Sequence, residues 1–144
     1  MVLDTTVCVD LLRERAQGIH GAAYHALDAL GDSRLYLSVY SVCELNTGAL
    51  LSSNKPVEQR RVADFVQHLT VLYPDVAFPT VYAEAAAALL TAGTPIPVMD
   101  LLIGITAKTN GLPLLTRDRK HFDRIPGLVV EWYGPDDHPR RAEG

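Results

Sequence analysis

Cysteine is scarce in this chain, and long apolar runs are missing altogether. Only Cys8 and Cys43 occur among 144 residues, too few and too unpatterned for a disulfide framework or a zinc site. No apolar stretch approaches the roughly 18 residues that a membrane-spanning helix needs. The N-terminus also lacks the basic segment of a signal peptide. These absences predict a protein of the reducing cytosol without a membrane partner.

An excess of basic residues is also missing. The 13 Lys and Arg residues stand against 17 Asp and Glu residues, which gives a net charge of −4 at pH 7. Any contact with nucleic acid therefore has to come from a local basic patch. The remaining composition, 48% hydrophobic and 21% charged, is ordinary for one compact domain. We expect that domain over residues 1–133 and a flexible polar tail over residues 134–144.

Short apolar segments alternate with amphipathic ones along the chain. This alternation is typical of a parallel sheet covered by helices on both faces. It predicts a three-layer α/β/α sandwich with four or five parallel strands. Strands are expected at residues 1–4, 35–39, 70–73, 112–115 and 128–131. Helices are expected at residues 7–14, 22–30, 41–51, 56–69, 80–92 and 98–110, the last one ended by Asn110-Gly111, with a short turn or helix at 121–123.

The 7–14 helix has a clear apolar side. Its apolar residues recur at helical spacing, so Asp10, Arg13 and Glu14 are expected to face solvent on the opposite side. Either Thr5 or Thr6 could cap the N-terminus of this helix.

Four carboxylates occupy comparable places in this pattern. Asp4 ends the first strand, Glu44 follows the second, Asp100 starts the 98–110 helix and Asp118 follows the next strand. The carboxyl ends of parallel strands lie at one edge of a sheet, where such sheets bind ligands, so the four are predicted to converge. Each also has a structural interpretation: Asp4 as a cap, Glu44 in a capping box with Ser41, Asp100 as a charge favoured at a helix start, and Asp118 as a turn residue.

Convergence of these carboxylates would have a chemical consequence. Two unit charges about 5 Å apart repel by roughly 3 kcal/mol at an effective dielectric near 20. A gathered set must therefore bind protons or a cation. Oxygen ligands without His or Cys favour Mg²⁺ or Mn²⁺, and such an ion can orient a phosphodiester and help to deprotonate water. The set therefore predicts a metal-dependent nuclease.

The ordered set of motifs resembles the PIN-domain family. It is most similar to the VapC-type ribonuclease toxins of toxin–antitoxin pairs. The resemblance spans about residues 1–133 and is carried by Asp4-Thr5-Thr6, the segments SVCEL at 41–45 and DLLIG at 100–104, Thr116-Arg117-Asp118, Phe122 and the segment IPGL at 125–128. No single motif decides it, whereas the order and spacing of the whole set are fairly specific.

This resemblance implies an activity, partners and a site. The activity is that of a Mg²⁺- or Mn²⁺-dependent endoribonuclease that cuts structured RNA such as tRNA or rRNA. The partners are a second copy of the chain, in a homodimer, and a cognate antitoxin whose C-terminal segment covers the acidic site. The implied acidic set is Asp4, Glu44, Asp100 and Asp118, with weaker supporting roles for Thr6, Thr116 and Asp123. Position 6 is often Asn or Ser in such toxins, so Thr6 departs mildly from the pattern.

A basic stretch adjoins the last of these acids. Arg117, Arg119 and Lys120, with His121, flank Asp118. They could contact RNA phosphates beside the metal, or they could form a solvated loop.

Three other functions fit parts of the pattern. A HAD-like phosphatase also begins with a strand that ends in Asp, but it needs a second acid two residues later, where this chain has Thr6. A phosphoacceptor receiver domain needs a lysine at a late strand end, whereas Lys108 lies inside a predicted helix. A non-catalytic binding module with an acidic pocket stays open as an alternative.

Overall fold

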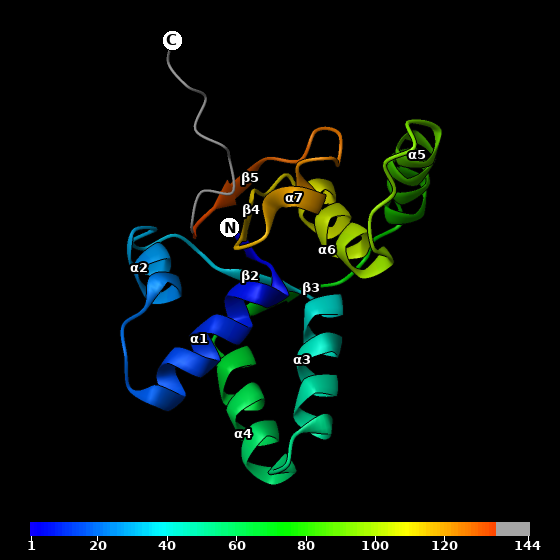
Figure 1. Ribbon diagram of the computed structural model, residues 1–144. Helices are drawn as coiled ribbons and strands as arrows, with labels where there is room; N and C mark the ends of the chain where they lie inside the picture. Colours follow the sequence, from blue (N-terminus) through cyan, green and yellow to red (C-terminus); the bar gives the residue numbers. More distant parts are fainter. Residues whose placement is uncertain (135–144) are drawn as a thin grey trace.

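A five-stranded parallel sheet forms the centre of the computed structural model, which describes residues 1–134. The strands follow the order β3-β2-β1-β4-β5, so β1 lies in the middle, between β2 and β4 (Figure 1). The predicted parallel sheet is therefore confirmed. Apart from Gly134, the predicted flexible tail lies outside the described residues. The strands are β1 (Val2–Leu3), β2 (Tyr36–Ser38), β3 (Thr70–Leu72), β4 (Leu114–Thr116) and β5 (Val130–Trp132).

Helices cover both faces of this sheet. Figure 1 shows α1, α3 and α4 on one side and α5, α6 and α7 on the other. The helices are α1 (Thr5–Gln17), α2 (Ala22–Asp28), α3 (Val39–Leu51), α4 (Lys55–Val66), α5 (Phe78–Thr91), α6 (Val98–Thr109) and α7 (Arg119–Phe122). Gly111, with φ of 64°, lies just beyond α6, as the predicted Asn110-Gly111 stop requires. Among the described residues, no helix is both long and apolar enough to span a bilayer.

Two separate cores lie on the two faces of the sheet. Successive strand side chains point to opposite faces, so the fully buried neighbours Val2 and Leu3 belong to different cores. Val2 shares a core with residues of α5, α6 and α7, including Ile103 and Phe122. Leu3 shares the other core with residues of α1 to α4, including Phe65. This division confirms the predicted three-layer α/β/α sandwich.

The helices after β1 and β2 start without an intervening loop. Asp4 is the N-cap of α1, because its Oδ1 accepts the backbone amide of Thr5 at 2.7 Å. Ser38, the last residue of β2, caps α3 by accepting the amide of Tyr40 at 3.2 Å. The structural interpretation of Asp4 as a cap is therefore confirmed. Neither Thr5 nor Thr6 caps α1, and the alternative of a capping box that begins at Ser41 is wrong, because both helices begin earlier than the pattern suggested.

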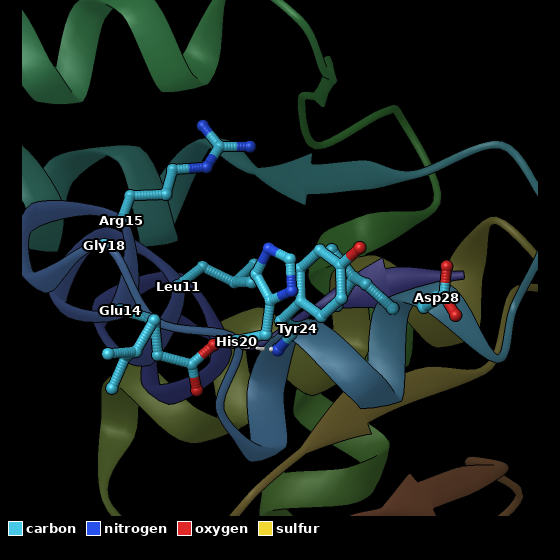
Figure 2. Close-up of a pocket in the computed structure, with 9 residues that line it drawn as sticks. Leu11, Glu14, Arg15, Gly18, His20, Tyr24 and Asp28 are labelled. Atoms are coloured by element: carbon cyan, nitrogen blue, oxygen red, sulfur yellow. Dashed lines mark hydrogen bonds between the residues drawn. The ribbon is translucent and has the colours of Figure 1, made fainter.

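Two acids of α1 are buried rather than solvated. Asp10 and Glu14 are 4% and 7% exposed, so their predicted outward orientation is wrong. Glu14 accepts the backbone amides of Ala23 and Tyr24, at 3.0 and 2.9 Å, at the start of α2. Figure 2 shows Glu14 and Tyr24 among the residues drawn there. Glu14 thus supplies the cap that Gly21, the N-cap residue of α2, cannot provide from a side chain of its own. The local pattern could not predict this, because these partners come from another helix.

Candidate active site

Asp4 is held at the carboxyl edge of the sheet by two hydroxyl groups. It is only 3% exposed, and its Oδ2 accepts hydrogen bonds from Thr6 Oγ1 at 2.8 Å and from Thr116 Oγ1 at 2.9 Å. Thr6 lies in the first turn of α1, and Thr116 ends the neighbouring strand β4. Both hydroxyls assigned to support the site therefore bind the same oxygen of Asp4, and they fix its orientation.

Burial shifts the protonation of Asp4. The pKa of this carboxyl group is raised above its ordinary value, first because the group is removed from water. Hydrogen bonds from Thr6, Thr116 and the Thr5 amide act in the opposite direction, while repulsion from Asp100 adds to the rise. Asp4 and Asp100 thus interact electrostatically, and a nearby cation would favour the ionised form of Asp4.

Glu44 is tied to the same edge through α1. The Thr5 hydroxyl donates to Glu44 Oε1 at 2.7 Å and also lies 3.1 Å from Ser41 Oγ. Ser41 is fully buried in the first turn of α3, and Glu44 is half-buried one turn later. Thr5 and Ser41 thus contact Glu44 or its hydrogen-bond partner at this candidate site, whereas the sequence interpretation placed them in the family motifs and as possible caps without a role in the site.

Asp100 has a partner that the sequence interpretation also missed. It lies in the first turn of α6, and its Oδ2 is 2.8 Å from Nδ1 of His121 in α7. Both side chains are about a quarter exposed, at 27% and 28%. No local signal could have identified this pair, because the two residues are 21 positions apart and the histidines show no ligand spacing.

Asp118 and Asp123 lie around α7. Asp118 is an exposed residue at the N-cap position of that helix, and its backbone amide donates to Thr116 Oγ1 at 3.0 Å. Asp123 forms an ion pair with Arg119 at 3.2 Å, and the Arg119 guanidinium lies 5.0 Å from the centre of the Trp132 ring. Arg119 therefore already makes contacts within the protein, besides any role toward RNA.

The structure shows an interaction between Asp4 and Asp100, but it does not gather the four predicted acids into one cage. Over residues 1–134, no three His, Cys, Asp or Glu side chains are arranged to hold a metal ion by themselves. Instead Asp4, Glu44 and Asp100 each have a hydrogen-bond partner of their own in the protein. The pair of Asp4 and Asp100 still suits a hard cation. Mg²⁺ is usually bound by one or two carboxylates together with water and substrate phosphates, rather than by an all-protein cage.

A pocket of about 500 Å³ lies elsewhere, between α1 and α2. Figure 2 shows residues that line it, with the His20 and Tyr24 rings stacked face to face at 3.8 Å between centroids. None of the predicted acidic site residues is among the residues that line this pocket. The predicted acids therefore lie away from this pocket.

Comparison with known proteins identifies the family. Residues 1–128 match the family model of the PIN domain. The chain belongs to the PIN domain family. Ribonuclease VapC1 of Haemophilus influenzae is 31% identical over 127 residues, which cover 88% of this chain and 92% of that protein. The tRNA(fMet)-specific endonuclease VapC of Salmonella typhimurium is 28% identical over 130 residues, which cover 90% and 95% of the two chains.

A solved structure supports the same assignment. The crystal structure of VapBC2 from Rickettsia felis, bound to a DNA fragment from its promoter, superposes on this PIN domain with a TM-score of 0.81 at 26% identity. The match covers 92% of this chain and 98% of that one.

The Asp4→Asn variant of this PIN domain should be more stable than the wild type at neutral pH in a chelator. The folded-state pKa of Asp4 lies above the ordinary 3.8. Its stabilising contribution is therefore fully present below the unfolded pKa and is lost as pH rises through the folded pKa. Thermal unfolding followed by circular dichroism should show a higher midpoint for the variant at pH 7.5 and a shrinking difference toward pH 4. A difference that stays constant or grows toward acid pH would contradict the raised pKa.

Proposed function

We propose that this PIN domain is a metal-dependent endoribonuclease that acts in the cytosol as the toxin of a toxin–antitoxin pair. One observation carries the proposal: a buried carboxylate, Asp4, is held by two threonines within electrostatic reach of Asp100. Such a pair is stabilised by a cation and borders the carboxyl edge of the sheet, where α/β proteins bind ligands. The names of the VapC relatives add support for RNA as the substrate.

Asp4 and Asp100 would hold the ion, which we take to be Mg²⁺ or Mn²⁺. Both residues offer only oxygen ligands, and Asp100 is partly open to solvent. When bound, the ion would orient a phosphodiester and help to activate a water molecule for attack. This assignment agrees with the open, two-carboxylate arrangement, which leaves room for substrate phosphates.

The other residues of the edge position these two acids and complete the charge. Thr6 and Thr116 fix Asp4, so the carboxylate cannot rotate out of the site. Thr5 holds Glu44, and we assign Glu44 to accept a proton released during attack. We assign Asp118 to the solvent-exposed side of the acidic set. The exposed Lys120 of α7 is assigned to a substrate phosphate.

The relatives support one protein partner for this chain. The Rickettsia felis, Salmonella typhimurium and Haemophilus influenzae structures are all VapBC structures, so we propose a cognate antitoxin that covers the acidic edge. We also propose that the toxin forms a homodimer.

Purified protein is expected to cleave an initiator tRNA transcript when Mg²⁺ or Mn²⁺ is present. The Salmonella relative is named for tRNA(fMet), which makes that transcript the first substrate to test. EDTA should reduce cleavage to background, because it would remove the ion that Asp4 and Asp100 are proposed to hold, and an excess of Mg²⁺ should restore it. Cleavage would be followed on denaturing gels with end-labelled RNA.

Two results would count against this function. Cleavage that persists in EDTA after extensive dialysis would contradict metal dependence. A folded protein that cleaves neither tRNA nor rRNA with either ion would favour the non-catalytic binding module.

A further inference from the structure

Asp10 is a buried carboxylate with donors from three parts of the chain. Its Oδ1 accepts from Arg13 Nη2 at 2.7 Å and from Arg117 Nη1 at 2.8 Å, and its Oδ2 accepts from the Tyr133 hydroxyl at 2.9 Å. Arg13 lies on the same helix, Arg117 follows β4, and Tyr133 follows β5. Removing a partner from a buried, hydrogen-bonded charge is costly, so Asp10 holds these segments together firmly.

Arg117 is fixed at its backbone as well as at its side chain. Its amide donates to Thr6 Oγ1 at 3.3 Å, and its carbonyl accepts the indole Nε1–H of Trp132 at 2.8 Å. Residues on both sides of Arg117 belong to the acidic edge. Thr116 donates to Asp4, and Asp118 begins α7. The position of Arg117 therefore fixes where these neighbours stand.

We propose that Asp10 is a positioning residue for the acidic site: through Arg117 it fixes the Thr116–Asp118 segment against Asp4. The inference rests on the proposed nuclease function and deepens it. It also gives Arg117 a different role from the RNA contact suggested by the sequence, because its guanidinium already has a buried counter-charge in Asp10. Phosphate contacts are left to other residues of the stretch.

Tyr133 strengthens this arrangement. Its pKa is raised well above the ordinary range, first by burial and then by its hydrogen bond to Asp10 and by the charge of that carboxylate. The hydroxyl therefore stays protonated and remains a donor. Asp10 thus joins the segment after β5 to the segment after β4, on the side of the sheet edge where Asp4 lies.

The chain offers a matched control in Arg13. It donates to the same oxygen of Asp10 as Arg117 does, but it lies three residues away on the same helix and its side chain is 56% exposed. Arg13→Ala therefore removes one donor without breaking a link between elements. Asp10→Asn removes the charge that holds Arg117, and Tyr133→Phe removes a single hydroxyl as a milder variant.

Cleavage kinetics on the initiator tRNA transcript test the proposal. Asp10→Asn should lower kcat by about 10- to 100-fold with KM within about twofold, the size usual for residues that orient ligand groups. Tyr133→Phe should lower kcat in the same direction, and Arg13→Ala should leave it unchanged. The double variant Asp10→Asn with Arg117→Met should be no slower than Arg117→Met alone, because both changes break the same link.

A second measurement does not depend on activity. Trp132 is the only tryptophan of the chain, and its indole binds the Arg117 carbonyl. Its emission should shift to the red in Asp10→Asn and not in Arg13→Ala.

Three outcomes would overturn the proposal. The first is a kcat of Asp10→Asn that equals the kcat of Arg13→Ala. The second is a double variant whose loss of kcat is the full product of the two single losses. The third is a Trp132 emission that does not change in Asp10→Asn. If the wild type cleaves no RNA, the proposed function fails. In that case the emission comparison still decides whether Asp10 holds Arg117.

Discussion

Asp4→Asn should reduce kcat for RNA cleavage by about 10³-fold or more, the scale seen when a central catalytic group is removed. Asparagine has nearly the shape of aspartate and caps helices equally well, so the start of α1 is preserved. What the variant loses is the buried negative charge beside Asp100. The measurement is single-turnover cleavage of the initiator tRNA transcript with Mg²⁺ in excess.

Asp75→Asn is the matched control for this variant. Asp75 is exposed, and its Oδ1 accepts the backbone amides of Ala77 and Phe78 at 3.1 Å, so it has a comparable capping role at another turn. The same chemical change there should leave cleavage within about twofold of the wild type, as expected for a surface site. If Asp4→Asn instead keeps more than a tenth of wild-type activity, Asp4 is not part of the catalytic centre.

The sheet could be predicted from the sequence because its signals are local. A short apolar run such as Leu114–Thr116, placed between two helices, specifies a buried parallel strand by composition alone. The end of α6 was equally local, since Gly111 adopts the left-handed conformation that closes a helix. The position of Asp4 at a strand end followed from the same pattern.

The partners of the buried acids could not be predicted this way. Asp10 binds Arg117 and Tyr133, which lie 107 and 123 residues further along the chain. Helical periodicity places Asp10 opposite the apolar side of α1. The local sequence pattern is the same whether this carboxylate is exposed to solvent or is buried under donors from distant parts of the chain. The same holds for Asp100 and His121, which meet only once α6 and α7 are packed together.

Phe122→Ala should lower the free energy of unfolding by about 3–5 kcal/mol, the range for a phenylalanine truncated in a core. Phe122 is 1% exposed, and it belongs to the same buried core as Ile103 and Ile105 of α6. The cavity left behind could not collapse easily between two elements in such contact. A domain with a typical total stability of about 5–15 kcal/mol would lose much of it. Urea unfolding followed by circular dichroism measures the change.

Truncation of an exposed apolar side chain to alanine is the control for the loss of core packing. Leu51 is 82% exposed at the end of α3, so Leu51→Ala should change the free energy of unfolding by less than about 0.5 kcal/mol. A loss below about 1 kcal/mol in Phe122→Ala would mean that the core tolerates a void at α7. Asp118 is the N-cap residue of that helix, and the helix carries the His121 that contacts Asp100. A loosely anchored α7 therefore could not hold this side of the acidic edge in place.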